Sequence, residues 1–249
     1  MDIGAYLRRI GFDAAPGLDV VALEALQRAH MTFVPFENLH VFHRRGVATD
    51  PRWSVQKIVE HGRGGWCYEL NGSFASLLEG LGFPVTRLGA TVLLDEPVGP
   101  QPDHATLRVD LDRPYLVDVG FGDSFIKPLL LDEPGPQNGG NASYGFETDD
   151  STTTLFMIGA EEAREPLYRF GNVARLPREF EPSSQYLQTT PGLRWTLHPF
   201  ATRLLDGGPD RVKLLHDRLR IRRDGVWTET PVSEANWARE LDRWFGLEP

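Results

Sequence analysis

The apolar periodicity of this chain changes about a third of the way along, at Pro84, and that change restricts the folds it can form. Before Pro84, apolar residues such as Leu70 and Phe74 recur at helical spacing. After it, residues 85–94 and 104–111 have the composition and spacing of half-buried strands. A helical first third followed by several short strands predicts an α+β chain, in which a compact helical bundle precedes an antiparallel sheet or barrel.

Capping residues locate the expected helices of the first third. Asp and Ser favour the position just before a helix, and Gly favours the position just after one. We expect four helices, of which the first is capped by Asp2 and runs through Ile10, the second is capped by Asp19, the third begins at Ser54, and the fourth opens at Cys67 and ends near Gly80 or Gly82.

Short strands separated by Gly, Pro, Asn and Asp follow this region. We expect strands at 85–94, 104–111, 115–119, 154–158 and 167–170, with a flexible surface loop at 135–141. Beyond residue 176 the pattern is mixed. It predicts a short helix at 182–188, strands at 196–205 and 212–222, and a final helix that begins near Ser233 and Asn236 and stops at Gly246.

Composition excludes several classes of function. The chain has 249 residues, 41% of them hydrophobic, and a formal net charge of −9. A negative chain without long basic runs argues against nucleic acid as a partner, and the basic segment 218–223 alternates like the solvated face of a strand. No apolar run has the length of a membrane span, and the first ten residues lack the apolar core of a signal peptide. We therefore expect a cytoplasmic protein without a membrane partner.

The single cysteine, Cys67, is either core filler or a working thiol, because one cysteine cannot form an internal disulfide. Free cysteines are among the most buried residue types, which favours the first interpretation. Against it, Cys67 follows the glycine pair Gly64-Gly65 and opens a predicted helix. Unpaired N–H groups and the helix dipole at such a position favour the thiolate, which is the nucleophilic form.

A cysteine nucleophile needs a base and a group that orients the base. Among seven histidines, His104 begins a predicted strand directly after a Pro-rich turn. Asp118 lies inside the apolar run 115–119. If the strands at 104–111 and 115–119 pair as a hairpin, His104 and Asp118 meet at one edge, and an imidazolium compensates the carboxylate. Otherwise Asp118 is a strand-edge carboxylate in water. The two interpretations are equally compatible with the residues alone.

Several stretches of the sequence together resemble the arylamine N-acetyltransferases. Cys67, His104 and Asp118 stand in the order and spacing of that family's cysteine, histidine and aspartate. The stretches that carry the resemblance are Pro35-Phe36-Glu37-Asn38-Leu39, residues 63–71 (Arg-Gly-Gly-Trp-Cys-Tyr-Glu-Leu-Asn), Val117-Asp118-Val119-Gly120-Phe121-Gly122, residues 185–195, and the ending Trp244-Phe245-Gly246-Leu247. The resemblance covers nearly the whole chain.

The resemblance implies a fold of three domains: a helical bundle at 1–83, an antiparallel β-barrel at 84–176 and an α/β lid at 177–249, around a Cys-His-Asp core like that of cysteine proteases. It also implies a cytoplasmic acyltransferase of xenobiotic metabolism. Such an enzyme moves an acetyl group from acetyl-CoA to an arylamine or arylhydrazine by ping-pong kinetics, through a thioester on Cys67. Neither a metal nor any other cofactor is implied.

The resemblance also assigns roles to further residues. A triad of Cys67, His104 and Asp118 is expected to carry the chemistry, with the backbone N–H of Tyr68 as a donor to the oxyanion. The remaining assignments are an aromatic substrate pocket of Phe36, Phe121 and Trp195, a CoA passage at Gly120 and Gly122, and a hydrogen-bonding scaffold of Arg63, Glu37 and Glu69.

The chain departs from the family pattern at two places that affect CoA placement and acyl preference. Asp123 puts an acid beside the glycine loop, where a pyrophosphate would be repelled. Residues 210–214 replace a Gly-Arg pair before a strand of the lid. Neither departure touches the thiol chemistry.

Other interpretations use the same residues. A thiol hydrolase or an amide synthase would share the Cys-His-Asp triad and differ in the acyl acceptor. A protein that only binds aromatic ligands would leave all three residues idle. His40, His43 and His61 match no zinc spacing, and we expect them to be surface or core residues. A monomer and a homodimer are equally compatible with the sequence.

Overall fold

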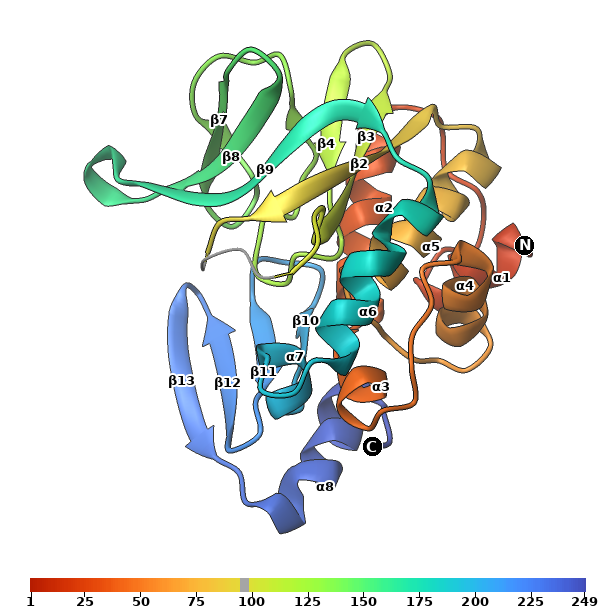
Figure 1. Cartoon of the computed structure of the whole chain (residues 1–249), viewed down its shortest axis with the longest axis vertical. Helices are drawn as coiled ribbons and strands as arrows, with labels where there is room; N and C mark the ends of the chain where they lie inside the picture. The colour runs from red at the N-terminus through yellow and green to blue at the C-terminus, as the bar shows by residue number, and fades with distance from the viewer. Residues whose placement is uncertain (95–98) are drawn as a thin grey trace.

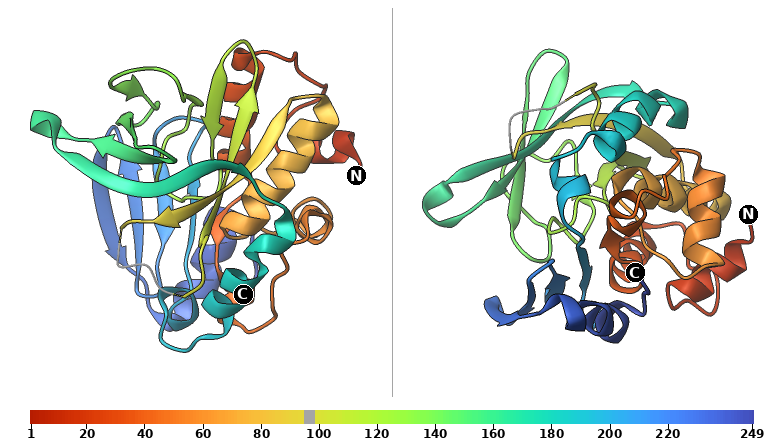
Figure 2. Two further views of the ribbon diagram at one scale, coloured as in Figure 1. Left: turned by 45° about the horizontal axis from the view of Figure 1, so that its top comes forward. Right: turned by 60° about the horizontal axis from the view of Figure 1, so that its bottom comes forward.

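The computed structural model describes residues 1–94 and 99–249, and it places helices on one side of the molecule and two sheets on the other (Figures 1 and 2). Part of the expected Pro-rich turn, residues 95–98, lies outside the described residues. The helices of the first third are α1 (Ile3–Arg9), α2 (Val20–Phe33), α3 (Leu39–Phe42), α4 (Pro51–Val59) and α5 (Cys67–Leu81).

Side-chain caps define where most of these helices begin. Asp2 accepts a hydrogen bond from the N–H of Ala5 at 2.9 Å, and Asp19 accepts one from Ala22 at 2.8 Å, which confirms both predicted caps. α5 begins at Cys67 and ends at Gly82, whose φ of 102° suits glycine, as predicted.

The predicted start of the third helix at Ser54 is wrong. Asp50 caps α4 by accepting from the N–H of Arg52 at 2.9 Å, and Pro51 occupies the first turn, where its missing N–H costs nothing. The hydroxyl of Ser54 instead donates to the Pro51 carbonyl within the helix at 3.1 Å.

The larger sheet has eight antiparallel strands that curl into a nearly closed barrel (Figure 1). Its edges, β5 and β6, come together where the Gln137 side chain forms two 2.8 Å hydrogen bonds with the backbone of Leu130. In spatial order the strands are β5 (Leu129–Leu130), β4 (Pro114–Val117), β3 (His104–Asp110), β2 (Val85–Val92), β9 (Arg164–Ala174), β8 (Thr152–Ile158), β7 (Ser143–Thr148) and β6 (Gln137–Asn138).

One expectation for this region needs correction, and one strand was missed. The predicted loop 135–141 contains β6, which pairs with β7, and its Gly139 carbonyl accepts from the N–H of Ile126 at 2.8 Å. The strand β7 was not predicted, because Gly145 interrupts its short apolar pattern. A mixed fold with a nearly closed eight-stranded barrel is otherwise the α+β architecture that we expect.

The smaller sheet has five antiparallel strands below the barrel in Figure 1. They are β1 (Phe36–Glu37), β10 (Ala201–Leu204), β11 (Arg211–Leu214), β12 (Arg218–Arg223) and β13 (Val226–Pro231), and α8 (Glu234–Phe245) packs on one face. The edge strand β1 comes from the helical first third. Because β1 pairs with β10, it joins the N-terminal region to the C-terminal sheet.

Helical turns lead from β9 of the larger sheet to β10 of the smaller one. These are the 3₁₀ turn Pro177–Phe180 and the helices α6 (Glu181–Thr189) and α7 (Arg194–Leu197), while a further 3₁₀ turn, Ala160–Glu162, connects β8 to β9 within the barrel. The predicted helix at 182–188 is confirmed by α6. The predicted strand from residue 196 is wrong at its start, because Leu197 N–H bonds to the Leu193 carbonyl at 2.9 Å and closes a helical turn. Within the described residues, none of the helices is both long and apolar enough to cross a membrane.

Candidate active site

Cys67 is the first residue of α5 and is 5% exposed. The two glycines before it permit close packing that no side chain would allow. A Cβ on Gly64 would lie 2.1 Å from the Pro35 carbonyl oxygen, and one on Gly65 would lie 2.6 Å from the Glu69 carboxylate. The glycines thus allow the chain before α5 to lie against β1, where Phe36 and Gly65 form an isolated β-bridge.

His104 and Asp118 meet because β3 and β4 pair as an antiparallel hairpin. His104 Nε2 lies 2.7 Å from Asp118 Oδ2, and both residues are at most 2% exposed. The burial of Asp118 excludes the alternative of a carboxylate in water. Since Nε2 faces Asp118, Nδ1 is the imidazole nitrogen left for Cys67.

The surroundings of this pair raise the pKa of His104 and lower that of Asp118. Burial disfavours the charged imidazole, but the charge and hydrogen bond of Asp118, together with a hydrogen bond to Cys67, outweigh it and raise the pKa of His104 to about 10. Burial also opposes the charged form of Asp118, yet His104, Asn71 and the Gly120 N–H hold the pKa of that carboxyl below its ordinary value. The structure therefore favours an imidazolium beside Cys67.

Asn71 connects the helix to the hairpin, a role that the sequence did not reveal. Its Nδ2 donates to the Ala105 carbonyl at 2.6 Å and to Asp118 Oδ1 at 2.8 Å, and its Oδ1 accepts from the N–H of Val119 at 3.0 Å. Asn71 stands one helical turn after Cys67, so its position on the same face of α5 was the available signal.

The backbone after Asp118 comes very close to the cysteine. A Cβ on Gly120 would lie 2.8 Å from the Cys67 Cα, so only glycine fits here. The next residue, Phe121, packs its ring 5.1 Å from the His104 ring and 5.0 Å from that of Tyr168. Tyr168, also missed from the sequence, lies 5.0 Å from His104 and completes an aromatic enclosure of the imidazole.

A buried ionic cluster lies behind the cysteine loop. Lys57 Nζ is 2.8 Å from Glu69 Oε1 and 3.8 Å from Glu37 Oε1, and all three side chains are at most 3% exposed. Glu69 also accepts from the N–H of Trp66 at 3.2 Å. Lys57 was not singled out from the sequence. Arg63, by contrast, donates to the Glu248 carbonyl at 2.6 Å and so contacts the C-terminal segment.

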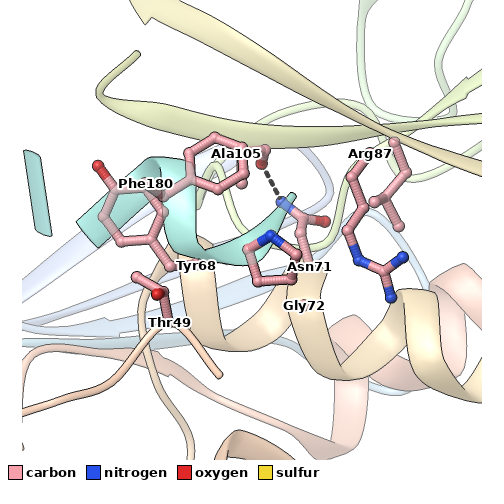
Figure 3. Close-up of a pocket in the computed structure, with 9 residues that line it drawn as sticks. Thr49, Tyr68, Asn71, Gly72, Arg87, Ala105 and Phe180 are labelled. Atoms are coloured by element: carbon pink, nitrogen blue, oxygen red, sulfur yellow. Dashed lines mark hydrogen bonds between the residues drawn. The ribbon is translucent and has the colours of Figure 1, made fainter. Parts of the chain in front are cut away.

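The side chain of Tyr68 lines a small pocket (Figure 3). Its hydroxyl lies 2.8 Å from Ser183 Oγ, and its ring packs on Phe180. Figure 3 also shows the hydrogen bond from Asn71 to the Ala105 backbone in the same pocket. The hydroxyl of Tyr68 is thus engaged by Ser183, while its backbone N–H lies in the first turn of α5.

A cleft of about 410 Å³ lies between the two sheets. Cys67, His104 and Asp118 do not line it, and Phe121, whose ring packs on that of His104, separates the cleft from the pair. Phe36, Phe121 and Phe200 form its aromatic wall, and Gly122 lies among them. Trp195 packs behind this wall, 6.0 Å from Phe36. The polar part of the lining consists of Asp123, Glu165, Arg194, His198, Thr202, Lys213 and His216.

Asp123 does not present a bare negative charge to this cleft. Arg222 binds it with both terminal nitrogens, at 3.1 and 3.2 Å, and Arg211 Nε lies 3.2 Å away. The expected repulsion of a pyrophosphate is therefore offset by two guanidinium groups. Arg222 also departs from the predicted solvated face of the basic strand, because its side chain is only 15% exposed.

Within residues 1–94 and 99–249, no group of three or more His, Cys, Asp or Glu side chains is placed to hold a metal ion.

Comparisons with known proteins give a consistent result. Residues 19–248 match the family model described as N-acetyltransferase. The chain is 37% identical to an arylamine N-acetyltransferase of Mycolicibacterium smegmatis over 202 residues, which cover 77% of this chain and 72% of that protein.

Solved structures extend the likeness to the whole fold. The arylamine N-acetyltransferase of Salmonella typhimurium superposes with a TM-score of 0.91 at 28% identity, over 98% of this chain and 90% of that one. The Mycobacterium marinum arylamine N-acetyltransferase in complex with CoA superposes with a TM-score of 0.88 at 28% identity, over 98% and 92% of the two chains.

Proposed function

This chain belongs to the arylamine N-acetyltransferase family, and we propose that it acetylates arylamines or arylhydrazines through an acetyl thioester on Cys67. As a member it is an acyltransferase whose acetyl donor is acetyl-CoA. The observation that carries the mechanism is the buried His104–Asp118 pair, with 2.7 Å between Nε2 and Oδ2, in which Cys67 is among the groups that raise the pKa of His104. Phe121 connects this pair to the aromatic cleft.

In the first half of the proposed reaction, the Cys67 thiolate attacks the carbonyl carbon of acetyl-CoA. A bond forms between Sγ and that carbon, and the bond from the carbon to the CoA sulfur then breaks. The His104 imidazolium gives its proton to the departing CoA thiolate, and Asp118 keeps the imidazole oriented. The products are acetyl-Cys67 and free CoA.

In the second half, the amine nitrogen attacks the acetyl carbon of acetyl-Cys67. Neutral His104 accepts a proton from that nitrogen as the Sγ–carbon bond breaks, which restores the thiolate and the imidazolium. Because CoA leaves before the amine reacts, the kinetics are ping-pong. The backbone N–H of Tyr68, in the first turn of α5, supplies a donor for the oxyanion in both halves.

The cleft suggests where the two substrates lie. Phe36 and Phe121 offer ring faces and edges for an arylamine, and Trp195, expected as a third member of this pocket, supports Phe36 from behind the wall. Gly122 lines the cleft and is the place where the thioester arm of CoA would pass. Gly120, also assigned to that passage, instead packs against the Cys67 backbone and lets the loop come close to the thiol. Lys213 lines the cleft beside Thr202, its cross-strand neighbour on β10. Its ammonium group suits the phosphates of CoA.

We also propose a division into a helical unit at 1–83, a barrel at 84–176 and an α/β lid at 177–249. The order of helices and strands supports it, with β1 as the segment of the first unit that pairs with the third. Glu37 and Glu69 act as a scaffold for the cysteine loop, and Arg63 connects that loop to the C-terminal segment. The cysteine-protease-like core is Cys67, His104 and Asp118.

The test measures free thiol released from acetyl-CoA, with and without a simple arylamine. Wild type should release thiol continuously only when the amine is present, and mass spectrometry without amine should map one acetyl group to Cys67. Cys67→Ala and His104→Gln should abolish release, whereas His61→Gln, a matched change at an exposed histidine, should not.

Thiol release by Cys67→Ala at the wild-type rate would refute the proposal. Rapid release without any amine would favour a thiol hydrolase, and the family match favours neither that alternative nor an amide synthase.

A further inference from the structure

We propose that Asp123 is a positioning residue, held by Arg211 and Arg222 of the five-stranded sheet, which fixes the glycine loop against Cys67 and His104. The glycine loop is defined here as residues 120–122. The inference rests on the proposed function, in which this loop borders the reacting groups. Asp123 departs from the family pattern and takes no part in the mechanism above.

The contacts of Asp123 have the geometry of a clamp between the two sheets. Arg222 Nη2 lies 3.1 Å from Oδ1 and Nη1 lies 3.2 Å from Oδ2, a fork that fixes the plane of the carboxylate. Asp123 follows β4 of the barrel, while Arg211 and Arg222 are paired residues of β11 and β12. The ion pairs therefore cross from one sheet to the other.

Burial makes this clamp stronger than an ordinary surface ion pair. The side chain of Arg211 is 2% exposed, that of Arg222 15%, and that of Asp123 28%. Arg211 Nε and Nη2 are both buried and have no hydrogen-bond partner among the described residues, so Nε meets Asp123 as an ion-pair contact at 3.2 Å. Asp123 thus lies within ion-pair distance of the buried Arg211 guanidinium. Removing only one member of such a pair is costly, because the other charge stays buried without a partner.

The glycine loop is fixed at its other end by the candidate triad. The N–H of Gly120 donates to Asp118 Oδ1 at 2.8 Å, and the Gly120 backbone touches the Cys67 backbone. Between the two anchors, Phe121 packs on the His104 ring. If the Asp123 end is released, Phe121 and the backbone over Cys67 lose one of their two fixed points, although every catalytic atom remains.

The cleft depends on the same anchor. Phe121, Gly122 and Asp123 all line it, and Thr202 and Lys213 line it from the sheet that holds the two arginines. The clamp therefore sets the separation of the cleft walls as well as the position of the loop. Displacement of reacting groups by about 1 Å costs roughly 100-fold in rate.

The experiment compares Asp123→Asn, Arg222→Gln and the double variant with wild type in two measurements. The first is kcat for arylamine acetylation, and the second is hydrogen–deuterium exchange of the peptide that covers the glycine loop. We expect each single variant to lower kcat by about 10- to 100-fold and to speed loop exchange at least about tenfold. The double variant should match Asp123→Asn, because Arg222 has no carboxylate left to hold once Asp123 has lost its charge, whereas Arg222→Gln alone keeps the contact between Arg211 and Asp123.

The matched control is Arg220→Gln. Arg220 lies on β12 two residues before Arg222, and its Nε is 2.7 Å from Glu229 within the same sheet. This variant loses an ion pair that does not reach the loop, so kcat and loop exchange should stay at wild-type values. Arg222→Lys, which keeps the charge without the fork, should recover part of kcat.

Asp123→Asn leaves Arg211 buried without its partner, so it is the variant that risks misfolding, and Arg222→Gln then decides the question alone. Wild-type kcat and loop exchange in Arg222→Gln would overturn the proposal, as would losses that multiply in the double variant. If wild-type protein forms no acetyl-Cys67, the proposed function fails. In that case the clamp is still tested by comparing hydrogen–deuterium exchange of the glycine loop in Arg222→Gln with that in Arg220→Gln. Faster exchange in Arg222→Gln alone confirms the clamp, and equal exchange refutes it.

Discussion

The charge state of His104 determines how the candidate site responds to pH. Its pKa in the folded protein is about 10, against 6.5 for an ordinary histidine, and that of Asp118 is below its ordinary 3.8. A raised histidine pKa contributes stability that is complete below pH 6.5 and is lost as pH rises through about 10. The lowered Asp118 pKa contributes stability above pH 3.8 that is lost as pH falls further.

Asp118→Asn should remove the negative charge beside His104 while nearly keeping the shape of the side chain. Without the carboxylate charge, burial dominates, and the pKa of His104 should fall well below the wild-type value of about 10. The titration is followed by NMR of the imidazole C–H signals, with exposed His61 as an internal reference. We expect kcat to fall by about 10³- to 10⁴-fold, as when the orienting aspartate of a triad is removed. An unchanged His104 titration would contradict this account.

The residue types that carry the chemistry were predictable, while their supporting contacts were not. Cys67 at a helix start and His104 and Asp118 on adjacent strands follow from local pattern and the hairpin. Asn71 supports Asp118 from 47 residues away, and Arg222 reaches Asp123 across 99. Such contacts arise from how the sheets and helices meet, which no local periodicity encodes.

At the scale of elements, α4 supports the start of α5 through Lys57. This lysine is the cation that lies between the buried carboxylates of Glu37 and Glu69. Burial raises the pKa of Glu69, although Lys57 opposes that effect. The cluster thus joins β1, α4 and the first turn of α5 beneath the thiol.

Lys57→Met should lower the free energy of unfolding by about 3–5 kcal/mol, because it leaves two buried carboxylates without a cation. The control is Arg28→Met, which removes Arg28 from its half-exposed pair with Glu24 one turn away on α2. That change should cost only about 0.3–0.5 kcal/mol. Both values come from urea denaturation at neutral pH. Equal losses in the two variants would show that the buried cluster contributes no more than a surface pair.

Element boundaries followed from the sequence wherever a cap or a glycine marked them. Asp2, Asp19 and Gly82 are examples. The prediction failed at α4, where Asp50 and not the predicted Ser54 caps the helix. It also failed where a strand lacks an apolar face. β13 was not predicted because nearly all of its side chains are at least partly exposed and it is held mainly by backbone pairing with β12.

At the scale of the whole molecule, the helical region and the C-terminal sheet are joined at Asn38. Its Nδ2 donates to the carbonyls of Trp195 and His198 at 2.8 and 2.9 Å, and its Oδ1 accepts from the N–H of Phe200 at 2.8 Å. Asn38 is 1% exposed, and it directly follows β1, the edge strand of the sheet. One side chain thus satisfies three backbone groups of a segment 157 to 162 residues away.

Asn38→Ala should weaken both this junction and the aromatic cleft. Each buried backbone group left without a partner costs about 1–3 kcal/mol, and we expect a total loss of roughly 2–4 kcal/mol because the segment relaxes in part. Trp195 and Phe200 pack on Phe36, so their displacement should raise the KM for arylamines by about tenfold. Urea denaturation and steady-state kinetics measure the two effects.

Asn141→Ala is the matched control for the junction. Asn141 also uses both ends of its amide, donating to the Ser124 carbonyl at 3.0 Å and accepting from the Tyr144 hydroxyl at 3.2 Å, but both partners belong to the barrel region. Its loss should cost stability without changing the KM for arylamines. If Asn38→Ala leaves that KM unchanged, or if both variants raise it alike, the aromatic wall does not depend on the junction. If Asn38→Ala raises the KM for arylamines and Asn141→Ala does not, the aromatic wall of the cleft depends on the contacts beside β1, a strand of only two residues. The helical region would then help to position the substrate side of the cleft.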